Sequence, residues 1–178
     1  MAIKWSDATP VLRLAPLPQH PTDPPRTPGE VDVWIAPEVD RQVMEHLRTR
    51  EVEQGGLLVG QAFADPRTGA VAHIRVSKSA AADDAQGTAF SLRMGAGVWR
   101  AAQALLVPGE VIVGWYHSHP GLTAFFSDTD RQTQRAFFNH PYSIGWVIDP
   151  VDGGEALFLG GDCTLVQRGP DAFEPAPC

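Results

Sequence analysis

Proline is concentrated in one part of this 178-residue chain, since seven of its 16 prolines fall between Pro10 and Pro28. Proline fixes φ and lacks a backbone donor, so this stretch can join neither a helix interior nor a central strand. We therefore expect an extended arm over 1–30, a folded domain over 31–168 and a tail over 169–178. The arm is either a plain linker or a docking segment for a partner or for its own domain. Its apolar residues are Val11, Leu12, Leu14 and Leu17.

The composition is that of an ordinary globular protein, with 43% hydrophobic and 20% charged residues. The net charge of −7 argues against a nucleic-acid binder, which needs a face rich in Lys and Arg. There is no apolar run of the roughly 20 residues that span a bilayer, so no membrane partner is expected. Two cysteines, Cys163 and Cys178, are too few for a disulfide framework or a thiolate zinc site. We expect free thiols and a cytoplasmic location.

Strand-like and helix-like patterns alternate along the domain. The expected strands lie at 31–35, 55–63, 70–77, 88–92, 111–116, 143–148, 155–159 and 163–167. Helical spacing covers 37–49, 98–106 and 128–138, and the small and acidic residues 80–87 indicate a loop. The pattern predicts a mixed α/β (α+β) fold, in which a mixed central β-sheet is flanked by helices.

Two histidines follow the apolar segment VIVGWY. His117 and His119 are two residues apart at a strand end, so both imidazoles can point to one spot. Ser127 is a good helix N-cap, and Asp130 is then the third residue of the helix. Two imidazoles and a carboxylate can hold Zn²⁺ and leave its fourth position for water, as in catalytic sites. Trp115 shares the strand face of His117, where it either lines a pocket or packs in the core.

Each half of this pattern also has an explanation without function. Histidines at a strand end are often polar loop residues, and Ser127 with Asp130 forms a capping box. The combined spacing, in which seven residues separate His119 from Ser127 and two separate Ser127 from Asp130, is much harder to obtain by chance. The pattern as a whole therefore favours a metal site.

The motif His117-Ser118-His119-Pro120, followed by Ser127 and Asp130, resembles that of the JAMM (MPN-plus, Mov34/JAB) zinc metalloproteases. The stretch EQGGLLVG, 53–60, resembles the first motif of that family, with Glu53 three residues before Gly56 and seven before Gly60. The resemblance covers about 31–160 in the order of elements. It implies a single JAMM/MPN-like domain over 31–168.

The resemblance implies a role for each matching residue. His117, His119 and Asp130 match the ligands of one catalytic Zn²⁺. Glu53 matches the general acid/base that acts on a zinc-activated water, and Ser127 matches the residue that hydrogen-bonds the substrate carbonyl or its oxyanion. Glu51 competes with Glu53 for that role, and only the spacing to the two glycines favours Glu53.

The resemblance also implies a substrate, the C-terminal tail of a ubiquitin-like protein or of its conjugate, cut after the terminal glycine. An extended tail adds to a sheet edge through main-chain hydrogen bonds. We expect its cradle at 79–87 with Thr88, Ala89 and Phe90. An apolar lip is expected from Leu122, Phe125 and Phe126.

The short chain is similar to stand-alone bacterial or archaeal members of the family, which are deubiquitinase-like and sometimes work with E1- and E2-like proteins. The favoured hypothesis is a zinc metallo-isopeptidase that deconjugates a modifier. One alternative is a processing peptidase for a ubiquitin-like or sulfur-carrier precursor. Another is a non-catalytic MPN scaffold, which is disfavoured because all the ligand residues are present. A RadC-like relative would have a different histidine motif.

Overall fold

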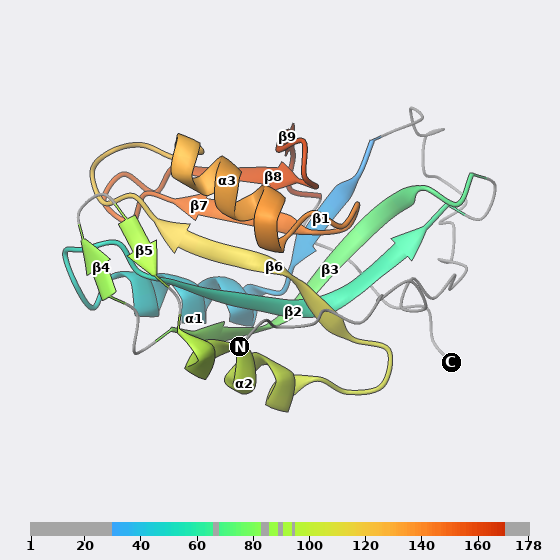
Figure 1. The fold of residues 1–178 in the computed structure, drawn as a ribbon, viewed down its shortest axis with the longest axis horizontal. Coiled ribbons are helices and arrows are strands. Elements are labelled where there is room, and N and C mark those ends of the chain that lie inside the picture. The colour runs from blue at the N-terminus through green and yellow to red at the C-terminus, as the bar shows by residue number, and fades with distance from the viewer. Residues whose placement is uncertain (1–29, 66–67, 83–85, 89–90, 94, 170–178) are drawn as a thin grey trace.

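A seven-stranded mixed sheet forms the centre of the structure, with strands in the order β1-β3-β2-β6-β7-β8-β9 (Figure 1). The computed structural model describes residues 30–65, 68–82, 86–88, 91–93 and 95–169. The strands of this sheet are β1 (Asp32–Ile35), β2 (Gly55–Ala64), β3 (Val71–Ala81), β6 (Val111–Ser118), β7 (Ile144–Ile148), β8 (Glu155–Leu159) and β9 (Thr164–Val166). Two short strands, β4 (Gln86–Thr88) and β5 (Ser91–Arg93), pair with each other.

Helices cover both faces of the sheet. Figure 1 shows α3 (Asp128–Phe137) in front of the sheet and α1 (Pro37–Leu47) behind it. Val39, Val43 and Leu47 of α1 join one buried cluster, whereas α2 (Ala96–Leu105) supplies Val98 and Ala102 to a second cluster. The predicted mixed α/β class, with one sheet flanked by helices, is confirmed.

The parallel pairing of β6 with β7 places the metal motif. β6 lies between β2, to which it is antiparallel, and β7, to which it is parallel. A parallel pair needs a crossover, and α3 supplies it here. The chain therefore leaves the C-terminal end of β6 with both histidines, turns into α3 and returns as β7.

Close strand packing explains the two glycines of the first motif. A Cβ at Gly56 would lie 2.2 Å from the Ala80 carbonyl oxygen and 2.6 Å from a ring carbon of Tyr116. A Cβ at Gly60 would lie 1.8 Å from the Arg75 carbonyl oxygen. Any side chain at either position would push β2 away from β3. The spacing that selects Glu53 in the sequence thus reflects how tightly β2 is packed.

Two of the expected boundaries are wrong. The predicted loop over 80–87 is shorter, because β3 runs to Ala81 and pairs with β2 there. The single strand predicted at 88–92 is instead the pair β4 and β5, of which Thr88 pairs with Ser91. In the part of the chain that the structure describes, no helix is long and apolar enough to cross a membrane. Apart from Glu30 and Gly169, the arm and the tail lie outside that part, so their boundaries stay predictions.

Candidate metal centre

The structure brings His117, His119 and Asp130 together in one buried cluster. His117 lies near the end of β6, His119 follows the strand, and Asp130 lies in the first turn of α3. Nε2 of His117 is 3.2 Å from Asp130 Oδ1, and Nε2 of His119 is 3.5 Å from Asp130 Oδ2. One potential ligand atom from each residue lies within 4.8 Å of the others. All three residues are buried.

Local backbone structure fixes this convergence. The His119 N–H donates to the Ile148 carbonyl of β7 at 2.9 Å, which holds His119 beside the strand end after β6 has finished. The Ser127 hydroxyl accepts a hydrogen bond from the Asp130 N–H, and the Asp130 carboxylate accepts one from the Ser127 N–H. This capping box begins α3 with Asp130 turned back toward β6.

Burial and mutual contacts shift the pKa values of all three groups. Burial by itself would raise the pKa of Asp130, but contacts with His117 and His119 outweigh it and lower that pKa. Burial lowers the pKa of His117, although Asp130 opposes the change. Burial opposes protonation of His119 too, but the Asp130 and Glu53 carboxylates raise its pKa. The cluster thus keeps an ionised carboxylate beside a neutral imidazole, and both are ligand forms.

The donor set fits a metal ion. Nε2 of His117, which faces Asp130, is buried and has no hydrogen-bond partner among the residues that the structure describes. Buried polar atoms without a partner are costly, so they call for a ligand. Two ligands about 2.1 Å from a tetrahedral Zn²⁺ would lie about 3.4 Å apart, which agrees with the 3.2 and 3.5 Å separations.

Glu53 reaches the cluster from β2's side of the sheet. Its Oε1 lies 3.7 Å from Nε2 of His119, and the residue is 6% exposed. Glu51, the competing residue, is exposed. The Ser118 N–H donates to the Gln54 carbonyl at 2.9 Å and the Gln54 N–H donates to Ser118 Oγ at 3.1 Å. These two bonds anchor the backbone beside Glu53 to the residue between the two histidines.

Burial raises the pKa of Glu53 from its usual value to about 7. That value includes a lowering of the pKa by His119 and a smaller raising by the Asp130 carboxylate. A carboxyl group with a pKa near neutrality can both accept and return a proton at physiological pH. The geometry and the electrostatics thus give Glu53 the properties of a general acid/base.

Ser127 is the N-cap residue of α3. Its hydroxyl donates to Asp130 Oδ2 at 2.6 Å and accepts from the Asp130 N–H at 3.2 Å. Both parts of the predicted capping box are present. The hydroxyl therefore lies beside one of the three cluster residues, but its contact with a substrate stays a prediction.

The expected substrate-contacting residues divide into three groups. Leu122 and Phe125 are 42% and 45% exposed, and the Phe125 ring lies 4.9 Å from that of His119. Phe126 does not form the expected lip, because it is buried and stacked on Phe158 at 4.0 Å between ring centroids. Thr88 lies in β4, whereas Ala89 and Phe90 lie outside the described residues.

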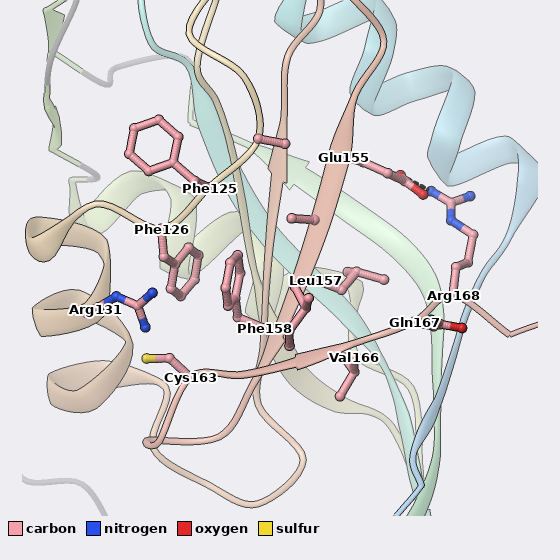
Figure 2. Close-up of a pocket in the computed structure, with 13 residues that line it drawn as sticks. Phe125, Phe126, Arg131, Glu155, Leu157, Phe158, Cys163, Val166, Gln167 and Arg168 are labelled. Carbon is pink, nitrogen blue, oxygen red and sulfur yellow. Dashed lines mark hydrogen bonds and ion pairs between the residues drawn. The ribbon is translucent and has the colours of Figure 1, made fainter.

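An apolar cleft of about 750 Å³ lies along β8 and β9 and is lined by side chains from both faces of the sheet. Figure 2 shows Phe126 and Phe158 side by side on its floor, with Arg131 of α3 on one side and Arg168 on the other. Phe125 lines this cleft and also contacts His119, so the cleft extends away from the metal cluster.

Sequence reasoning missed two buried polar residues near the site. Gln134 lies one helical turn after Asp130, so its spacing could have placed it on the same helix face. Asp149 is fully buried, and its carboxylate accepts hydrogen bonds from the N–H groups of Gly121 and Thr123, both at 3.0 Å. An Asp before Pro at a turn gives no signal of such a long-range contact.

Comparison with known families agrees with this geometry. The family described as prokaryotic homologs of the JAB domain matches residues 36–157, which include Glu53, both histidines and Asp130. The chain belongs to the JAB (JAMM/MPN) family. The predicted family membership is therefore confirmed.

Curated relatives match shorter stretches of this JAB chain. It is 40% identical over 101 residues, 56% of its length, to the NAD(+) hydrolase TcpA of Theionarchaea archaeon (strain DG-70-1). It is 31% identical over 61 residues, 34% of its length, to the ubiquitin carboxyl-terminal hydrolase RPN11 of Saccharomyces cerevisiae. It is 39% identical over 69 residues, 36% of its length, to COP9 signalosome complex subunit 5 of Kluyveromyces lactis. The matches span 28%, 20% and 18% of these relatives.

Proposed function

We propose that this chain is a zinc-dependent isopeptidase or peptidase that hydrolyses the bond after the C-terminal glycine of a ubiquitin-like protein. The observation that carries the proposal is the Glu53 carboxylate, 3.7 Å from His119 at the edge of the His117, His119 and Asp130 cluster. A general base beside a metal-binding cluster is the arrangement that metal-assisted hydrolysis needs. The relative named ubiquitin carboxyl-terminal hydrolase supports the substrate class.

His117, His119 and Asp130 would hold the ion. Zn²⁺ bound there would supply a Lewis acid that activates water and polarises the scissile carbonyl. Glu53 takes a proton from the attacking water while the water oxygen bonds to the carbonyl carbon. Glu53 then returns that proton to the leaving amine nitrogen as the C–N bond breaks, so one carboxyl group serves as base and then as acid. In the metal-free site its pKa is already raised to about 7, which shows how far burial favours the protonated form that the second step needs.

Ser127 would stabilise the negative charge that develops on the carbonyl oxygen. A hydroxyl aimed at that oxygen favours the tetrahedral intermediate over the substrate. The contact of the hydroxyl with Asp130 fixes its position before a substrate arrives. The proposal therefore requires the hydroxyl proton to be shared between Asp130 and the substrate oxygen.

An extended tail is the substrate form that we propose. Phe125 and Leu122 are exposed, and the Phe125 ring lies 4.9 Å from that of His119, so apolar parts of such a tail can pack there. The pair β4 and β5 offers a short sheet edge for main-chain hydrogen bonds. We propose that Thr88, Ala89 and Phe90 contact the tail there.

Three substrates separate the possible activities. The first carries a ubiquitin-like protein linked through an isopeptide bond to a lysine peptide, and the second is a linear C-terminal fusion of that protein. The third is NAD⁺, because one relative is named an NAD(+) hydrolase. We expect zinc-restored cleavage of the isopeptide substrate after the terminal glycine. Cleavage of the linear fusion alone would favour precursor processing, and cleavage of NAD⁺ alone would favour the activity in the name of that relative. No cleavage of any of the three would favour a binding scaffold.

Matched histidine variants link this cleavage to the cluster. We expect His119→Ala to lose at least about 100-fold in kcat/KM, because a metal ligand is gone. His140→Ala is the control, since His140 is an exposed histidine outside the cluster. Equal activity of the two variants would overturn the proposed site.

A further inference from the structure

A buried amide connects the helix of Asp130 to the strand of His117. Gln134 is fully buried, and its Oε1 accepts a hydrogen bond from the Trp115 indole N–H at 2.7 Å. Its Nε2 donates to the Phe138 carbonyl and to the Ser143 carbonyl, both at 3.0 Å. The amide thus joins β6, the end of α3 and the segment that leads into β7.

Chemistry fixes the orientation of this amide. The indole N–H of Trp115 can only donate, and the two backbone carbonyls can only accept. Oε1 must therefore face Trp115, and both N–H groups of Nε2 must face the carbonyls. Gly145 leaves the room for this, since a Cβ there would lie 3.0 Å from Gln134 Oε1 and 2.3 Å from the Phe126 ring.

The indole ring of Trp115, which Gln134 holds, stacks in turn on the imidazole ring of His117 in the metal cluster. The Trp115 and His117 rings have centroids 4.5 Å apart and an interplanar angle of 8°. Phe138 stacks on Trp115 as well, with centroids 5.7 Å apart. The rings of His119 and Phe126 lie at 73° and 36° to that of His117, so among the described residues the Trp115 stack is the parallel ring contact that can hold its plane.

We propose that Gln134 and Trp115 are positioning residues that hold the His117 imidazole and the Asp130 turn of α3 in the geometry that binds metal. This inference rests on the proposed metal site. Ligating histidines are usually oriented by a hydrogen bond to their second ring nitrogen. Here a stacked indole takes that task, and the Gln134 amide locks the indole. Because Gln134 lies one turn after Asp130, the same amide fixes both ligands at once.

The alternative is that these residues only pack the core, and a zinc titration separates the two cases. Gln134→Leu removes all three hydrogen bonds, whereas Trp115→Phe keeps an aromatic ring and removes only the indole donor. Val43→Ala is the matched control, because it removes buried volume on the α1 face of the sheet. The zinc dissociation constant of each full-length variant is measured by competition with a chromophoric chelator, beside its free energy of unfolding without zinc.

We expect Gln134→Leu to weaken zinc binding about 10- to 100-fold, as substitution of outer-shell partners does. Trp115→Phe should weaken it less, and it keeps the test usable if Gln134→Leu fails to fold. The double variant should bind zinc no more weakly than Gln134→Leu, because the hydrogen bond that Trp115→Phe removes is already lost in Gln134→Leu. Val43→Ala should lose stability and change zinc affinity less than about twofold.

Two results would overturn the inference, and only the second would also overturn the proposed function. If the native chain binds one zinc ion and both positioning variants bind it as tightly as Val43→Ala does, the residues only pack the core, and the proposed function survives. If the native chain binds no zinc, the proposed function and this inference fall together.

Discussion

Oε1 of Glu53 lies 3.7 Å from Nε2 of His119, so the first motif and the His-x-His motif meet at one point. The backbone makes this meeting obligatory. Gln54, next to Glu53, exchanges hydrogen bonds with Ser118, which lies between the two histidines. The side chain of Ser118 is fully buried, and it accepts from Gln54 rather than facing the cluster. Both halves of the site are therefore parts of one hydrogen-bonded unit.

The first prediction concerns the choice between Glu53 and Glu51. We expect Glu53→Gln to lower kcat by about 100- to 10,000-fold, because the amide cannot move a proton. Glu51→Gln should keep most activity, since Glu51 is exposed. Steady-state cleavage of the isopeptide substrate measures both, and elemental analysis should find the same zinc content in each. A larger loss of kcat in Glu51→Gln than in Glu53→Gln would mean that Glu51 is the general base and that the proposed assignment is wrong.

The second prediction concerns metal removal. Zinc that binds only the folded state should stabilise the chelator-treated protein by about 2.7 kcal/mol when free zinc is 100 times the dissociation constant. Thermal unfolding with and without zinc measures this shift. Asp130→Asn should abolish the shift, whereas Asp128→Asn removes an exposed carboxylate from the same helix turn and should keep it. A shift that survives in Asp130→Asn would argue for a different metal site.

The third prediction concerns pH and the metal-free protein. The pKa of Glu53 is about 7 when folded and near its usual 4.5 when unfolded. Between these values the folded state holds a proton that the unfolded chain has lost. The contribution of Glu53 to the free energy of unfolding is therefore greatest below about pH 5 and falls as pH rises to about 8, by about 3 kcal/mol.

Glu53→Gln isolates this contribution, because an amide does not titrate in that range. Urea unfolding of both chelator-treated proteins from pH 5 to pH 8 measures the difference between them. We expect the variant to gain stability relative to the native chain as pH rises. A difference that is constant across this range would show that burial does not raise the pKa of Glu53.

The sequence predicts best what is local. Strand alternation places His117, and the capping pattern places Asp130 in the first turn of its helix, as the structure has it. These features depend on neighbours within a few residues, so spacing alone reveals them. The class of fold follows from the same local patterns, since strand and helix periods alternate along the chain.

Features that depend on distant contacts could not be predicted. Phe126 is expected on a lip because it follows exposed Phe125, but stacking on Phe158 buries it. Strands β4 and β5 are only three residues each, so they show no alternation that separates two strands from one. Asp149 and Gln134 become important only when the chain folds β7 against β6. The partners of Phe126, Asp149 and Gln134 include residues 32, 28 and 19 positions away in sequence, and no short pattern encodes such contacts.

The fourth prediction concerns the loop after His119. Burial by itself would raise the pKa of Asp149, but the backbone N–H groups that donate to it lower that pKa, so it stays ionised. Asp149→Ala should destabilise the protein by about 3 kcal/mol, because several N–H groups lose their acceptor. It should also raise KM, since Leu122 and Phe125 lie in or beside the loop that Asp149 holds. Asp152→Ala, at an exposed neighbour, is the control for denaturant unfolding and hydrogen exchange over 119–125.

The last prediction separates the two roles of Ser127. As a cap, its hydroxyl contributes about 1 kcal/mol to stability, which Ser127→Ala should lose and Ser127→Thr should largely keep. If the hydroxyl also donates to the developing oxyanion, Ser127→Ala should lower kcat about 100-fold with little change in KM. Unfolding, zinc affinity and steady-state kinetics are measured together on both variants. A loss of activity no larger than the loss of zinc affinity would mean that Ser127 acts only by orienting Asp130 through their 2.6 Å hydrogen bond.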